Sequence, residues 1–128
     1  MQVMLSELIT EKVSLLNNNI GGQEFKIKPK YFKKITMVES DKYKVQLEVL
    51  IENEKTNPFP VDVHVIISGI FKFQNIEDHE VINNYLNIEA VKTIFPYIRT
   101  SITNITTSSF IPPILLPIID VRVCKEKE

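Results

Sequence analysis

Two long runs of alternating apolar and polar residues constrain the fold of this chain most strongly. Residues 42–53 carry apolar side chains at every second position: Tyr43, Val45, Leu47, Val49 and Ile51. Residues 59–73 repeat this period, with Phe59, Val61, Val63, Val65, Ile67, Phe71 and Phe73 on one parity. A period of two is typical of a β-strand with one buried face. Because only a short Asn- and Pro-containing stretch separates the runs, the sequence predicts a long antiparallel hairpin.

The composition favours sheet but argues against a fold made of sheet alone. The chain has 19 Ile, 12 Val and 8 Thr among its 128 residues, but only 3 Gly and no Trp. β-Branched side chains favour pleated strands, whereas many tight hairpins would require more glycine. We therefore expect a few long strands and a second layer that covers their apolar face.

Two further strands are predicted upstream of the hairpin. Residues 24–35 alternate less regularly, and Pro29 together with a cluster of lysines indicates an edge strand. Residues 9–16 fit both a helix and a strand, and we favour a strand that begins near Ile9. We expect residues 1–8 and 121–128 to be poorly ordered ends of one domain, residues 1–128.

A helix is predicted in the second half of the chain. Apolar residues recur there at spacings of three and four: Val91, Ile94, Phe95, Ile98, Ile102 and Ile105. Because proline is tolerated in the first turn of a helix, we expect the main helix to begin near Pro96 and to end near Thr107. A short helix or turn would precede it. Arg99 is the only charged residue between Lys92 and Asp120, which suits packing against another helix or chain.

The charge balance excludes several partners as defaults. Fifteen Lys and Arg against 16 Asp and Glu give a net charge of −1, so no bulk field attracts nucleic acid or an anionic membrane. Prolines break the longest nearly uncharged stretch, residues 100–119, so we expect no stable membrane insertion. The first residues lack the pattern of a secretory signal, and we expect a cytoplasmic protein.

The residues that carry chemistry most often in proteins form no recognisable motif. His64 alternates with Asp62 on a predicted strand, His79 lies in an acidic loop, and Cys124 is the single cysteine. No spacing of Cys, His and acids matches a zinc site. We therefore expect a protein that is not an enzyme and has no metal or cofactor.

Three local motifs occur in an order that is found in a known family. They are Gly69-Ile70-Phe71 at the end of the hairpin, Phe-Pro-Tyr-Ile-Arg at residues 95–99 and Phe-Ile-Pro-Pro-Ile-Leu-Leu-Pro-Ile at residues 110–118. With the strand of residues 43–51, they resemble the SecB protein-export chaperone family over residues 9–119. The resemblance implies an α+β fold, a four-stranded antiparallel sheet with helices packed on one face. It also implies a homotetramer, built as a dimer of dimers.

The resemblance further implies an ATP-independent holdase that binds unfolded or precursor polypeptides and keeps them export-competent for the SecA motor. Carried over by position, the client-binding residues are Ile76, Val81, Ile82, Tyr85, Leu86 and Ile88 in the crossover after the hairpin, and Phe110, Ile111, Ile114 and Leu115 near the C-terminus. The oligomer interface would use Tyr97, Thr100, Ser101, Thr103, Asn104 and Thr107.

Two other readings of the function stay open. The short segment after Ile119 also resembles the SecB-like branch associated with toxin–antitoxin systems, whose client is an antitoxin. SecA and an antitoxin are therefore both candidate partners. The other reading is a non-catalytic adaptor that uses residues 110–119 for one partner.

Overall fold

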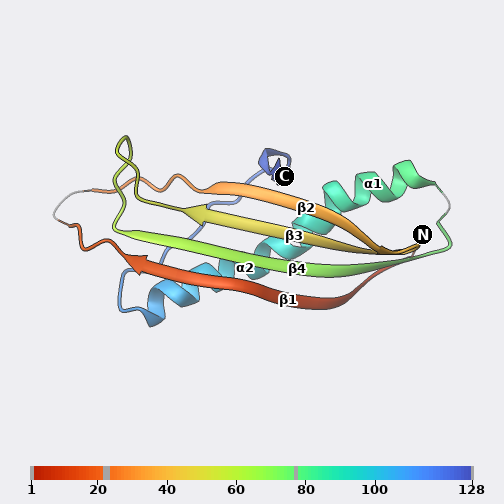
Figure 1. The fold of residues 1–128 in the computed structure, drawn as a ribbon, viewed down its shortest axis with the longest axis horizontal. Helices are drawn as coiled ribbons and strands as arrows, with labels where there is room; N and C mark the ends of the chain where they lie inside the picture. Colours follow the sequence, from red (N-terminus) through yellow and green to blue (C-terminus); the bar gives the residue numbers. More distant parts are fainter. Residues whose placement is uncertain (1, 22–23, 77, 128) are drawn as a thin grey trace.

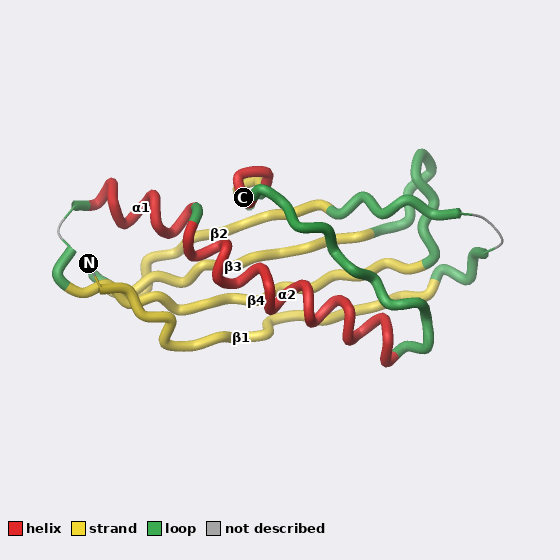
Figure 2. The backbone as a smooth tube through the Cα atoms, turned by 180° about the vertical axis from the view of Figure 1, so that it is seen from behind, coloured by secondary structure: helices red, strands yellow, loops and turns green. Residues whose placement is uncertain are grey.

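The structure is a computed structural model that describes residues 2–21, 24–76 and 78–127. Its sheet has the strand order β1-β4-β3-β2-β5, formed by β1 (Gln2–Asn17), β2 (Lys30–Glu39), β3 (Lys42–Ile51), β4 (Val61–Gln74) and β5 (Lys125–Glu126). The helices are α1 (His79–Asn87), α2 (Glu89–Ser108) and a 3₁₀ turn, η1 (Val121–Val123). Both α-helices lie on one face of the sheet (Figures 1 and 2). The predicted α+β architecture is therefore confirmed.

The central hairpin supplies most of the core. β3 and β4 pair antiparallel, with Val45 opposite Gly69 and Ile51 opposite Val63. The apolar residues that alternate in the two runs, Tyr43 to Ile51 and Phe59 to Phe73 at every second position, are buried. From the helical layer, Ile94, Ile98 and Ile102 of α2 have no exposed surface. The stiff β-branched side chains thus fill the space between sheet and helix, as the alternation predicts.

β1 is longer than the sequence indicated. It begins at Gln2 rather than near Ile9, so residues 2–8, which we expected to be part of a poorly ordered end, lie in the strand. Val3 and Leu5 pair with Phe73 and Phe71 of β4 and pack against the core. The ladder shifts register between Leu5 and Glu7 and again between Thr10 and Lys12. Each irregularity reverses the parity of the strand, which obscures the alternation in the sequence.

The sheet has a fifth strand that was not predicted. β5 pairs parallel with β2, Lys125 opposite Phe32, so the sheet is mixed rather than four-stranded and antiparallel. Residues 121–127, which we expected to be part of a poorly ordered end, pack on the fold through the buried Val121 and Cys124. β2 itself begins at Lys30, directly after Pro29, and the predicted strand of residues 24–35 was too early.

α2 begins at Glu89, seven residues before Pro96, so the predicted helix start is wrong. Proline removes only the hydrogen bond to the carbonyl oxygen of Lys92, and both residues lie on the exposed side of α2. Burial of Val91, Ile94 and other apolar residues outweighs that loss. α1, the predicted short helix, starts at a cap in which the Asp78 side chain accepts the Glu80 N–H at 2.9 Å.

Phe110 ends α2 in a conformation that glycine usually adopts. Its φ is 61°, and the Ile111 N–H donates to the Thr106 carbonyl oxygen at 3.3 Å, as in a Schellman motif. We expect Phe110→Gly to stabilise the fold by about 1 kcal/mol, because a Cβ is strained in the left-handed region. The midpoint temperature of thermal unfolding would then rise by about 4 °C. Phe110→Ala, the control, keeps the Cβ, and an equal gain in that variant would contradict the explanation.

Within the described residues, no helix is long and apolar enough to span a lipid bilayer.

Candidate functional site

An apolar groove lies at the end of the sheet where β1 and β3 end and β4 begins. It encloses about 530 Å³. One wall is the first part of the C-terminal strip, our name for residues 110–119, which turns back after α2 (Figure 2). Among the described residues that line the groove, Asn17 alone has a polar side chain. The groove therefore offers burial of apolar surface and few fixed hydrogen-bonding demands.

The C-terminal strip is held against α2 by side chains of the helix. Three prolines leave the strip without a regular ladder of its own. The Thr103 hydroxyl donates to the Ile114 carbonyl oxygen at 2.9 Å, and the Ile114 N–H donates to Thr106 Oγ1 at 3.0 Å. Arg99 Nε donates to the Leu116 carbonyl oxygen at 3.2 Å. The Leu116 side chain is 2% exposed, and its burial in the core also holds the strip in place.

The residues that follow the strip are fixed to the edge of the sheet formed by β2 and β5. Val121 and Cys124 are buried, and the Lys127 N–H donates to the Lys33 carbonyl oxygen of β2 at 2.8 Å. Asp120 accepts hydrogen bonds from Arg122, which hold the pKa of Asp120 at about 2. The wall formed by the strip is thus attached both to α2 and to β2.

The other wall comes from two connections that the sequence did not assign to the site. Ile20, Phe25 and Ile27 lie between β1 and β2, and Phe59 and Pro60 precede β4. The Phe25 and Phe59 rings meet edge to face with centroids 6.1 Å apart. The available sequence signal was the pair Phe25 and Ile27 within residues 24–35, the stretch predicted as an edge strand.

The predicted C-terminal client residues separate into two groups. Ile111, Ile114 and Leu115 line the groove, and Leu115 is 71% exposed. Phe110 is 98% exposed and does not line it. The groove thus includes three of the four predicted positions, with Phe110 projecting from the turn beside them.

The crossover residues lie elsewhere. Figure 1 shows α1 near the opposite end of the sheet from the end of α2, so one chain does not bring the two predicted sets together. Ile82 and Leu86 are buried in the core, because α1 packs its apolar face on the sheet. Val81 is exposed, whereas Ile76, Tyr85 and Ile88 are partly buried against the core.

The predicted interface residues of α2 also divide. Tyr97, Thr100, Asn104 and Thr107 are exposed, and Ser101 is half-buried. Thr103 donates its hydroxyl to the strip of its own chain. The uncharged face of α2 therefore has an intramolecular role at Thr103, and its other predicted members remain accessible.

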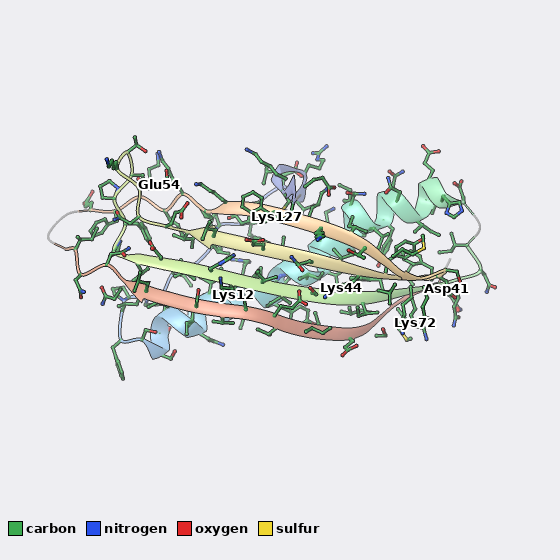
Figure 3. All side chains as sticks on the ribbon, viewed as in Figure 1. Lys12, Asp41, Lys44, Glu54, Lys72 and Lys127 are labelled. Atoms are coloured by element: carbon green, nitrogen blue, oxygen red, sulfur yellow. The ribbon has the colours of Figure 1, made fainter. Side chains whose placement is uncertain are left out.

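The sheet face away from the helices carries polar side chains, among them Lys12 and Lys44 (Figure 3). His64 Nε2 lies 2.6 Å from Glu48 Oε2, so these two side chains pair. Glu11 accepts hydrogen bonds from Lys44 and Ser68 at 2.7 Å each, and these bonds lower the pKa of Glu11. These contacts join strands of the one sheet, with the Glu11–Lys44 pair reaching across β4, and they form no recognisable site for catalysis.

Among the described residues, the remaining reactive groups give no sign of a reaction centre. Burial raises the pKa of the Cys124 thiol, which disfavours the nucleophilic thiolate. In the part of the chain that the structure describes, no group of three or more His, Cys, Asp or Glu side chains could hold a metal ion. The groove is the feature of this molecule best suited to binding.

Fold and groove together define a class: an α+β protein, one sheet backed by helices, with an apolar groove at the sheet end. Comparison with known proteins places the chain within that class. The family model described as preprotein translocase subunit SecB matches residues 18–124. The chain is 32% identical over 83 residues to the protein-export protein SecB of Anaplasma marginale (strain Florida), 63% of this chain and 46% of that protein. Against SecB of Anaplasma phagocytophilum (strain HZ), identity is 31% over 90 residues, 67% of this chain and 56% of that protein.

A solved structure shares the fold. It is the Mycobacterium tuberculosis SecB-like chaperone Rv1957 in complex with a ChAD peptide from the Rv1956 HigA1 antitoxin. The TM-score is 0.75 at 13% identity, covering 91% of this chain and 90% of that one. The chain belongs to the SecB family, and the resemblance inferred from the motifs is confirmed. SecB proteins are non-catalytic chaperones. The match spans about half the length of the SecB relatives named above.

Proposed function

We propose that this protein is an ATP-independent holdase chaperone that binds unfolded or precursor polypeptides in the cytoplasm and keeps them unaggregated and export-competent. The observation that carries the proposal is the apolar groove of about 530 Å³ between the C-terminal strip and the β1–β2 connection. An unfolded chain presents spaced apolar side chains, and a groove of Ile, Leu, Phe and Pro buries them without requiring one sequence. Several weak contacts along one client add through avidity.

The test is suppression of aggregation. The purified protein, in molar excess over a client that is being unfolded by heat, should slow the rise of light scattering, with and without ATP. No effect at any excess would contradict the proposal.

A second candidate function is a chaperone dedicated to a toxin–antitoxin system. It is favoured by the shared fold with a chaperone that was solved with an antitoxin peptide. Titration of several unrelated unfolded chains separates the candidates, because a general holdase binds most of them, whereas a dedicated chaperone or an adaptor binds one. Titration with SecA tests whether clients are handed to the export motor.

We further propose a homotetramer that uses the exposed residues of α2 named above. Thr107→Glu should then weaken assembly by about 3 kcal/mol, because it would bury an unpaired charge. Multi-angle light scattering at micromolar concentration should show a smaller mass than for the wild-type chain. Thr36→Glu, an exposed threonine of β2, is the matched control and should leave the mass unchanged. An unchanged mass for Thr107→Glu would contradict the proposal that this face of α2 forms the interface.

A further inference from the structure

The connection between β1 and β2 has to cross the end of the sheet. These strands are not neighbours, because β4 and β3 lie between them. Its described residues, 18–21 and 24–29, lie past the ends of these two strands and contribute Ile20, Phe25 and Ile27 to the groove. A crossing segment has no strand ladder of its own, so other contacts must fix its path.

The β3–β4 loop, residues 52–60, supplies these contacts at three points. The Asn18 side-chain amide donates to the Phe59 carbonyl oxygen at 3.1 Å. The Phe25 ring packs edge to face on the Phe59 ring. Further along, Asn57 Nδ2 donates to the Lys26 carbonyl oxygen at 3.0 Å. One wall of the groove is thus built on the neighbouring loop.

Asp62, at the start of β4, joins the two connections. Its Oδ1 accepts from Asn18 Nδ2 at 3.0 Å and from the Asn53 backbone N–H at 2.8 Å. Asn53 in turn accepts the Phe59 N–H on its side-chain oxygen at 3.0 Å. One carboxylate oxygen therefore connects the crossing segment to the loop that carries the groove residue Phe59. Because one oxygen accepts from both segments, it holds them next to each other, as a positioning role requires.

We propose that Asn18 and Asp62 are positioning residues that hold the β1–β2 wall in place and so preorganise the groove for its client. The inference rests on the proposed function, because it assigns the determinants of client affinity at that groove. Without these contacts the wall must be ordered during binding, and the ordering free energy is subtracted from the affinity.

The experiment compares four variants of the full chain. The probe is reduced and carboxymethylated α-lactalbumin, a permanently unfolded polypeptide, and its affinity is measured by fluorescence anisotropy. We expect Asp62→Ala and Asn18→Ala to bind it roughly tenfold more weakly, which corresponds to about one lost hydrogen-bond contribution. Asp62→Asn keeps the accepting Oδ1 and should stay within about twofold of the wild type. Ser68→Ala is the matched control, because it removes another hydrogen bond to a carboxylate on the same sheet, away from the groove.

Hydrogen exchange gives a second readout that does not depend on a client. Backbone amides of residues 18–21 and 24–27 should exchange faster in Asp62→Ala and Asn18→Ala, and at the wild-type rate in Ser68→Ala. If Asp62→Ala does not fold, Asn18→Ala decides, because it leaves the Asp62–Asn53 bond in place.

Wild-type affinity and exchange in both alanine variants would overturn the inference and leave the proposed function intact. An equal loss of affinity in Ser68→Ala would also overturn it, because the effect would then be general destabilisation. A wild-type chain that binds no probe would refute the proposed function. The hydrogen-exchange rates of Asp62→Ala and Asn18→Ala would then still test the positioning role. Rates equal to those of the wild type would refute that role as well.

Discussion

Leu115→Asp should weaken client binding roughly 30-fold, about 2 kcal/mol, while the fold keeps its stability. Leu115 lines the groove and is 71% exposed, so its side chain is available to a client but contributes little to the core. Substitution removes an apolar contact and adds a carboxylate that the client would desolvate. An exposed position changes the free energy of unfolding by at most about 0.5 kcal/mol. Anisotropy with an unfolded client and thermal unfolding measure the two effects separately.

The strip itself provides the control. Ile118 lies three residues further on, is 85% exposed and does not line the groove. Ile118→Asp introduces the same charge on the same segment, so it should leave client affinity unchanged. Equal losses in both variants would show that the whole outer surface of the strip binds clients, and no loss in either would place the binding site elsewhere.

The sequence predicts the centre of this fold well because the information there is local. The alternation in β3 and β4 is regular, and the same residues that alternate are buried in the structure. In β1 two register irregularities interrupt the pattern, so the strand could not be told from a helix. β5 has two residues, too few to show a period in the sequence. Its pairing with β2 depends on the path of the chain that precedes it.

The groove is only half visible in the sequence. Ile111, Ile114 and Leu115 follow from the family resemblance, whereas Ile20 and Phe25 become a wall only because the β1–β2 connection crosses the sheet end. That path is fixed by contacts with residues more than 30 positions away along the chain, as in the bond from Asn57 to Lys26. No periodicity encodes such contacts. The uncharged face of α2 has an explanation within one chain, because Thr103 and Thr106 form hydrogen bonds with the backbone of the strip.

Gly69→Ala should destabilise the fold by about 1 to 3 kcal/mol, the usual range for overpacking a filled core. This glycine opens the Gly-Ile-Phe motif and lies in β4 under α2. A Cβ there would come within 3.0 Å of Leu5 Cδ1 and of Phe71 Cε2, and within 3.2 Å of Ile94 Cδ1. Phe71 and Ile94 are almost fully buried, so they have little room to move. Glycine is therefore required at this position because the side chains of β1 and α2 approach the strand closely.

Denaturant unfolding measures the effect, and Gly21→Ala is the control. A Cβ at Gly21 would meet nothing within 4 Å, so that variant should stay within about 0.5 kcal/mol of the wild type. Adding Leu5→Val, which removes the Cδ1 atom, should restore part of the stability lost in Gly69→Ala, because contacting residues are not additive. A Gly69→Ala protein as stable as the wild type would mean that β1 and α2 can move away from β4. The C-terminal strip, which forms one wall of the groove, would then be held by a helix that can move.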